Sequence, residues 1–520
     1  MSTAQCYIRQ VREMLRNWPK RKEADEFPAP ARALRSPSAV SPPFWRMVLA
    51  SPRFFALVAA GAFAVRFFFY FRFPHITGDS LIYGDIAKNW LEHGVYGLTH
   101  ATGPEPTWIR LPGYPAFLVA CFILFGREHY HAVLLAQIVI DVLGCFFIAD
   151  LARRTLSEGA SRFAFLLAAI CPFTANYVSA PLAETLSIFC TAVALDCAVA
   201  GFIATKENRP AAGAWWWCAF GLSAGILVRP DGGILLAAIG LLLLWRMWQR
   251  GDERVRLFWA GALIVVIAIA PLVPWTIRNW RDFHRFEALA PRYASDPDEF
   301  VPTGFDRWVR TWMAEYVSTE EIYWQIPGAE VDFTKLPSRA FDNANQYART
   351  KAIFEDYANT DFIGPELNAR FEALAHERIH SHPLRYYVWL PALRIADMWL
   401  RPRTEMLPLN TRFWEYADDT QDCILATLWG VLNLLFLMPA AMAAARGPRP
   451  RYLALMLLFV LLRSAFLGTL ENPEPRYTLE CFPVVLVLGA GWLATLDKRA
   501  LILMFSAIAV LEAGVLLGAR

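Results

Sequence analysis

The stretch YHAVLLAQIVIDVLGCFFIADL, residues 130–151, decides the fold. Its length matches the roughly 20 mainly apolar residues that a helix needs to cross a bilayer, and Arg153 and Arg154 follow it closely. Comparable stretches recur along the 520 residues, of which 56% are hydrophobic and only 19% are charged. A soluble protein of this length carries more charge than that. The sequence therefore predicts an all-α polytopic membrane protein.

The distribution of basic residues orients the predicted spans. Residues 1–44 hold eight Lys and Arg but no apolar core of a signal peptide, so they predict a basic cytoplasmic tail, since positive charge stays on the cytoplasmic side. About eleven spans follow, and they leave the C-terminus outside. The predicted spans are about 53–71, 130–151, 163–177, a fourth that ends near Lys206, a fifth that ends at Arg229, a sixth that ends at Trp248, 257–275, 423–445, 452–469, 479–496 and 501–518.

Two apolar segments are unsuited to crossing the membrane. Residues 113–125 are too short, and residues 386–400 are interrupted by Arg394 and Asp397, so both predict helices that lie at the interface. Residues 276–385 hold 18 acidic and 13 basic residues and predict a small periplasmic domain. The predicted parts are a tail at 1–44, a catalytic transmembrane module at 45–275 with its first periplasmic loop at 74–129, a periplasmic region at 276–400, and C-terminal transmembrane helices at 401–520.

Polar residues gather at the predicted periplasmic ends of the spans. Arginine suits a lipid-phosphate leaving group because its planar fork of donors stabilises the developing charge. An ionised aspartate such as Asp79 suits the role of general base toward an attacking hydroxyl, and a helical bundle supplies a groove for a lipid tail. The sequence has no GxGxxG, P-loop, HExxH or GxSxG pattern, and we predict no nucleic-acid partner.

The polar motifs themselves resemble a known family. They are Gly78-Asp79-Ser80 with Tyr83, Arg110-Leu111-Pro112-Gly113-Tyr114-Pro115, Ala183-Glu184-Thr185, Arg229-Pro230-Asp231, Arg278-Asn279 and Pro475-Arg476-Tyr477. With these motifs the chain resembles the GT-C type integral membrane glycosyltransferases. Within that type it is similar to glycosyltransferase family 39, which includes the protein O-mannosyltransferases, and to the bacterial aminoarabinose transferases and RgtA/B/C/D-like proteins.

The resemblance implies roles for individual residues. Asp79 matches the catalytic base in the first loop, and Glu184 matches an assisting acid in the next periplasmic turn. Arg110 matches the basic residue that contacts the lipid phosphate. The resemblance further implies substrate or lipid-phosphate contacts for Tyr83, Arg229, Arg278, Arg476 and Tyr477.

Several of these residues also suit simpler interpretations. Asp79 lies where a helix N-cap is expected, and an arginine at a helix end is typical of an interfacial anchor. The charged residues inside apolar spans, Arg66, Asp141, Asp196, Arg463 and Glu512, favour pairing between helices. His376, His380 and His382 favour a surface helix because no neighbouring ligand completes a metal site. No metal ligands are predicted, and a divalent cation at the phosphate stays open.

Two function classes fit these features. The first is an inverting glycosyltransferase of the bacterial inner membrane, with its site on the periplasmic side. Its partners would be the bilayer, a polyprenyl-phosphate sugar donor and an extracytoplasmic glycan, lipid or protein acceptor. The second is a transporter or flippase for a polyprenyl-linked or other amphiphilic anion. A transporter predicts functional charges at the membrane midplane and often internal repeats. The one-sided motifs favour the enzyme.

Overall fold

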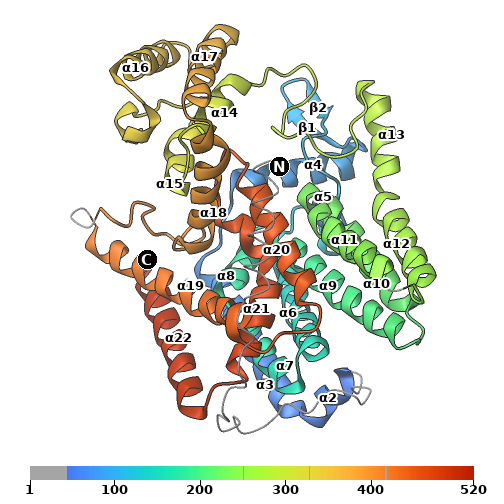
Figure 1. Ribbon diagram of the computed structural model, residues 1–520. Coiled ribbons are helices and arrows are strands. Elements are labelled where there is room, and N and C mark those ends of the chain that lie inside the picture. Colours follow the sequence, from blue (N-terminus) through green and yellow to red (C-terminus); the bar gives the residue numbers. More distant parts are fainter. Residues whose placement is uncertain (1–43, 250, 327, 416–418, 520) are drawn as a thin grey trace, which may run out of the picture. The chain divides into compact units, whose positions relative to one another are not determined.

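The computed structural model describes residues 44–249, 251–326, 328–415 and 419–519, and Figure 1 labels its elements. This part of the chain is mostly helical and has one short hairpin, which confirms the predicted all-α fold. The predicted tail at 1–44 lies outside the described residues except for Phe44, where α2 (Phe44–Ala50) begins.

Long apolar helices make up the framework. Within the described residues, eight helical stretches are long and apolar enough to cross a membrane, or nine if one bent pair counts as a single span. The eight are α3 (Pro52–Arg72), α6 (Tyr130–Thr155), α9 (Glu184–Lys206), η2 with α11 (Pro230–Gly232 and Gly233–Gln249), α12 with α13 (Arg254–Ile269 and Leu272–Phe283), α19 (Thr420–Arg446), η7 with α21 (Pro475–Cys481 and Phe482–Leu493) and α22 (Lys498–Gly518).

Three apolar helices are shorter. Helices α10 (Ala212–Val228) and α20 (Leu453–Leu467) coincide with the fifth and ninth predicted spans, and α5 (Gly113–Phe125) has the bounds predicted for an interfacial helix. The predicted count of eleven needs both α10 and α20 to cross the membrane. The structure is compatible with that count, which stays a prediction.

The bent pair has a chemical cause. Helix α7 (Glu158–Ile170) meets α8 (Pro172–Ala175) and η1 (Asn176–Ser179) at an angle of 49°. Pro172 has no backbone N–H, so the helical hydrogen bond to the Ala168 carbonyl cannot form. The guanidinium of Arg66 on α3 donates to that carbonyl at 2.9 Å and also to the carbonyl of Ala169. A side chain from a neighbouring helix thus satisfies the end of α7.

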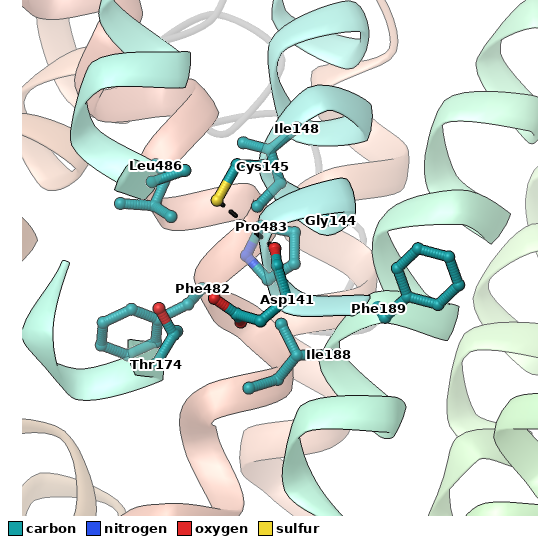
Figure 2. Close-up of a pocket in the computed structure, with 11 residues that line it drawn as sticks. Asp141, Gly144, Cys145, Ile148, Thr174, Ile188, Phe189, Phe482, Pro483 and Leu486 are labelled. Carbon is teal, nitrogen blue, oxygen red and sulfur yellow. Dashed lines mark hydrogen bonds between the residues drawn. The ribbon is translucent and has the colours of Figure 1, made fainter. Parts of the chain in front are cut away.

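Arg66 is also held by an ion pair inside the bundle. Its guanidinium lies 2.7 Å from Asp141 on α6. Asp141 borders a cavity of about 10 Å³ between α6, α9 and α21, shown in Figure 2 with Cys145, whose thiol donates to the Asp141 carbonyl. A cavity of that size holds at most about one water. The charges predicted to pair between helices do so here, and Arg154 likewise lies 2.8 Å from Asp196.

The loop after α3 folds into helix, hairpin and helix. Helix α4 (Gly78–His93) leads into β1 (Gly97–His100) and β2 (Gly103–Pro106), which pair antiparallel, and α5 follows. The hairpin was not predicted, because its two strands are only four residues long and lack an alternating apolar pattern. Asp85 on α4 accepts hydrogen bonds from the backbone N–H and hydroxyl of Thr99 at 2.6 and 2.7 Å. Asp85 therefore fixes the hairpin against its helix.

Residues 303–381 form a helical region with its own core. Phe305, Trp308, Trp312, Phe354 and Phe371 are buried together there. Its elements are α14 (Thr303–Arg310), α15 (Tyr316–Ser318), η3 (Thr319–Tyr323), η4 (Phe333–Lys335), η5 (Ser338–Ala340), α16 (Ala344–Ala358) and α17 (Pro365–Ser381). A separate apolar core is what a small domain needs, and the predicted periplasmic domain at 276–385 stays a prediction.

The second segment predicted as an interfacial helix is helical, and its place at the interface stays a prediction. A π-helical turn, η6 (Arg385–Trp389), runs into α18 (Leu390–Leu400). Arg394 on α18 is buried and donates to the carbonyls of Met313 at 2.9 Å and Gly468 at 3.1 Å. The charge that made this segment unsuited to lipid therefore joins the 303–381 region to the loop after α20.

Candidate active site

Asp79 stands in the first turn of α4. The N-cap of that helix is Thr77, whose hydroxyl accepts from the backbone N–H of Ser80, while the Ser80 hydroxyl accepts from the backbone N–H of Thr77, each at 3.3 Å. These two residues complete a capping box. The carboxylate of Asp79 is therefore not used as the cap and faces other partners.

Two arginines from distant parts of the chain hold Asp79. Arg110 donates to Oδ1 at 2.8 Å, and Arg476 donates to Oδ2 at 3.1 Å. Burial raises the pKa of Asp79, but the charges and hydrogen bonds of Arg476 and Arg110 outweigh it and lower that pKa to about 2. Asp79 is consequently ionised at neutral pH and has a positively charged partner on each oxygen.

Glu184 lies on the other side of Arg476. Its Oε1 is 3.0 Å from Nη1 of Arg229 and 3.7 Å from Nη1 of Arg476. Its side chain is 4% exposed. Because Glu184 begins α9 and Arg229 ends α10, the packing of these two helices brings the pair together. The two predicted catalytic acids thus share one arginine.

A buried ionic network continues from Arg229. Its Nε lies 3.3 Å from Asp231 and 3.2 Å from Glu480. Arg463 on α20 contacts the same two carboxylates, with Asp231 at 2.9 Å. Positive and negative groups alternate throughout, which is the condition for burying charge at tolerable cost. Arg229 is therefore part of the support of the site.

Two predicted tyrosines lie against the arginines. The ring centre of Tyr83 is 5.8 Å from the guanidinium carbon of Arg110, and that of Tyr477 is 5.3 Å from the guanidinium carbon of Arg229. The Tyr477 hydroxyl donates to Glu474. Burial raises the pKa of Tyr83 to about 12, so its hydroxyl remains protonated and able to donate.

Arg403 fixes the backbone of the segment that carries Arg476. Arg403 is buried and donates to the Pro475 carbonyl at 2.8 Å and to the Thr478 hydroxyl at 2.7 Å. These bonds flank Arg476 on both sides along η7. They hold the backbone of η7 so that the Arg476 side chain reaches α4.

Arg278 has a different environment from the other predicted site residues. It donates to the backbone carbonyls of Thr107 and Tyr96 at 2.8 and 2.7 Å, and its Nε lies 2.8 Å from Asp282. The carbonyls belong to the loop between α4 and α5. Arg278 thus fastens that loop to α13, and its predicted phosphate contact stays a prediction.

Two residues that contact the arginines had no predicted role. Glu474 and Glu480 are 2% and 3% exposed, and both bind site arginines. The available signal was the position of Glu474 two residues before Arg476. Glu480 gave no such signal, since a lone glutamate near a helix start is common.

No metal ligand set is found within the described residues. They contain no group of three or more His, Cys, Asp or Glu that could hold an ion. His376, in the predicted surface helix, is 71% exposed and lies 3.0 Å from Glu372. The positive charge around Asp79 comes from arginine side chains.

Part of the chain matches a known protein family. Residues 106–275 match the family model described as dolichyl-phosphate-mannose-protein mannosyltransferase. The predicted likeness to the GT-C glycosyltransferases is confirmed. The matched segment of this GT-C-like chain contains Arg110, Glu184 and Arg229. Asp79, Tyr83, Arg278, Arg476 and Tyr477 lie outside it, and the roles of all eight residues stay predictions.

Solved structures add distant similarities. ArnT from Cupriavidus metallidurans bound to undecaprenyl phosphate is 16% identical with a TM-score of 0.37, over 83% of this chain and 77% of that one. The Archaeoglobus fulgidus oligosaccharyltransferase tethered with an acceptor peptide is 11% identical with a TM-score of 0.49, over 92% of this chain and 55% of that one. These values are too low to carry a function over. No curated protein matches the chain.

Proposed function

We propose that this protein is an inverting glycosyltransferase that takes its sugar from a polyprenyl-phosphate donor. The observation that carries the proposal is the placement of one carboxylate, Asp79, between two arginines, Arg110 and Arg476. The reaction needs a base and a cationic site for a phosphate within reach of each other, and this group contains both. The family match over residues 106–275 supports the same class of reaction.

The proposed chemistry is a single displacement. Asp79 accepts the proton of an acceptor hydroxyl while the hydroxyl oxygen attacks the anomeric carbon of the donor. The bond between that carbon and the phosphate oxygen breaks, and the polyprenyl phosphate leaves with the bonding electrons. Arg110 and Arg476 bind the leaving phosphate. Attack opposite to the leaving group inverts the anomeric centre.

The low pKa of Asp79 comes from its pairing with Arg476 and Arg110. A carboxylate with a pKa of about 2 is a weak base at neutral pH. A donor phosphate attracts the same two arginines. We propose that, when the donor binds, the charge of its phosphate competes for Arg110 and Arg476 and weakens their pairing with Asp79. Weaker pairing with these two arginines raises the basicity of Asp79 at the moment a base is needed.

The surroundings of the site extend the proposal. We propose that the protein lies in a bacterial inner membrane with Asp79 on the periplasmic side, as the basic residues of the cytoplasmic loops indicate. The acceptor is a glycan, lipid or protein on that side. Residues 276–400 are proposed to select it, since the helical region 303–381 connects through Arg394 to the loop that precedes Arg476.

The deciding experiment compares wild type with Asp79→Asn in transfer from radiolabelled polyprenyl-phosphate sugars. Purified protein and a membrane extract as acceptor source are used. The variant is expected to lose on the order of 10²- to 10⁴-fold in rate, the usual contribution of a general base, and to keep its fold. Glu92→Gln on the same helix is the matched control and is expected to retain full activity.

Two outcomes would contradict the proposal. Full transfer activity in Asp79→Asn would remove Asp79 from its role as base. If no donor supports transfer by the wild type, and the protein instead moves lipid phosphate saturably across liposomes, the chain is a transporter.

A further inference from the structure

Glu474 lies two residues before Arg476 and is 2% exposed. Three side chains meet at its carboxylate. Nε of Arg476 lies 2.5 Å from Oε2, Nδ2 of Asn472 donates to Oε1 at 2.8 Å, and the Tyr477 hydroxyl donates to Oε1 as well. A buried carboxylate needs such partners to offset its loss of water. All three belong to residues 472–477, so the Glu474 carboxylate is held by its own loop.

The atoms of Arg476 are divided between two tasks. Nε forms the ion pair with Glu474, whereas Nη2 donates to Asp79 and Nη1 lies 3.7 Å from Glu184. A guanidinium is planar, so holding Nε beside the Glu474 carboxylate limits the directions that both Nη groups can take. The contact with Glu474 therefore determines where the two outer nitrogens can donate.

We propose that Glu474 is a positioning residue that holds Arg476 by its Nε and so directs both Nη groups toward the phosphate of the lipid donor. This inference rests on the proposed function, because it takes Arg476 to be a phosphate ligand. Glu474 itself touches neither donor nor acceptor. It acts through Arg476, and Asn472 and Tyr477 keep its carboxylate in place.

The change in phosphate affinity caused by Glu474→Gln has opposite signs for a positioning role and for a purely electrostatic role. A carboxylate beside an anion site repels the anion. Replacing Glu474 by glutamine removes that repulsion and, by charge alone, strengthens phosphate binding. Positioning predicts the reverse, since glutamine loses the charged contact with Nε and Arg476 gains rotamers that point away from the site.

The test is equilibrium binding of farnesyl phosphate to full-length protein in detergent. Glu474→Gln is expected to raise the dissociation constant on the order of 10- to 100-fold, the usual effect of losing a hydrogen bond to a charged group. Arg476→Ala is measured alongside and is expected to weaken binding at least as much. Glu474→Asp keeps the charge with a shorter reach and is expected to fall between wild type and Glu474→Gln.

Glu471→Gln is the matched control. Glu471 is a buried glutamate of the same loop, but it pairs with Arg292 at 2.8 Å and Arg310 at 3.2 Å. Its replacement removes the same charge from the same loop without touching Arg476. The dissociation constant of this variant is expected to stay within about twofold of wild type.

The outcomes distinguish the positioning role of Glu474 from the phosphate-binding role of Arg476. If Arg476→Ala weakens binding and Glu474→Gln binds as well as wild type or better, the positioning role is wrong and the proposed function stands. If Arg476→Ala binds normally, its phosphate role in the proposed function fails. Should Glu474→Gln not give monodisperse protein, Glu474→Asp decides the question, and an unchanged dissociation constant for it overturns the inference.

Discussion

Two groups of buried charge in this protein differ in what their arginines are bound to. In the bundle interior, Arg66 and Asp141 are 0% and 6% exposed. The remaining donors of Arg66 reach backbone carbonyls at the end of α7. At the candidate site, the side chains of Asp79 and Arg110 are 27% and 22% exposed. The first group is closed, and the second is open to another molecule.

The difference shows how a structural ion pair can be told from a candidate site. A closed pair has its partners within the protein, so breaking it leaves a charge without a partner. An open group keeps part of its surface for a ligand, and its internal partners can be exchanged. On this view the first group determines stability and the second determines activity.

The largest effect is expected from a substitution that breaks the Arg66–Asp141 pair. Arg66→Met leaves Asp141 and the carbonyls at the end of α7 without their partner, and unfolding free energy is expected to fall by about 3–5 kcal/mol, as for other broken buried pairs. Thermal or denaturant unfolding of the detergent-solubilised protein measures this. The double variant Arg66→Met with Asp141→Leu should recover part of the loss, since it leaves no unpaired charge. Equal stability of Arg66→Met and wild type would show that the pair is not structural.

A smaller effect is expected at the open group. Arg110→Lys keeps the positive charge but replaces the planar fork by a compact ammonium, so kcat/KM for the lipid donor should fall about 10-fold. Unfolding free energy should change by less than about 1 kcal/mol, because the pair is partly exposed. Arg127→Lys, an exposed arginine paired with Glu92, is the control. A large loss of stability in Arg110→Lys would place this pair in the structural class.

The buried carboxylate of Asp306 adds a test through the pH dependence of stability. Burial, and next the charge of Glu471, raise the pKa of Asp306 from 3.8 to about 6. The folded protein therefore keeps this proton where the unfolded chain has released it, and stability falls as pH rises from about 4 to about 6. Asp306→Asn should remove about 1–3 kcal/mol of that pH dependence. Denaturation midpoints measured over this pH range test it, and parallel curves for both proteins would contradict it.

The smallest expected effect concerns divalent metals. Arg110 and Arg476 already supply positive charge to the proposed phosphate site, so we expect EDTA to change the transfer rate by less than about twofold. The assay is the same donor transfer with and without chelator. An activity that EDTA abolishes and Mg²⁺ restores would show that the arginines are insufficient.

Much of the helical framework could be predicted from the sequence. Apolar length and flanking charge located α6 and the other long helices, and the bounds of α5 were those predicted. The reason is physical, since a lipid environment requires uninterrupted apolar helices and excludes most alternatives. The side of the membrane on which Asp79, Glu184 and Arg476 gather was inferred in the same way.

The pairings within the site could not be predicted. Asp79 is 31 residues from Arg110 and 397 from Arg476 in the sequence. A sequence gives the depth of a residue in the membrane but not the rotation of its helix, which decides the neighbours. For the same reason, the contacts of Arg278 with the backbone of the loop between α4 and α5 could not be predicted.

The bend at Pro172 links the framework to the site. The helical turn η1 that follows the bend presents the carbonyl of Ser179 to the backbone N–H of His75 at 3.1 Å, two residues before the cap of α4. The angle of α8 and η1 therefore sets where the Asp79 helix starts. A substitution at Cys171 or Pro172 that straightens α7 and α8 would therefore move Asp79 relative to Arg110. The distance between the proposed base and its arginine could be changed in this way without altering either side chain.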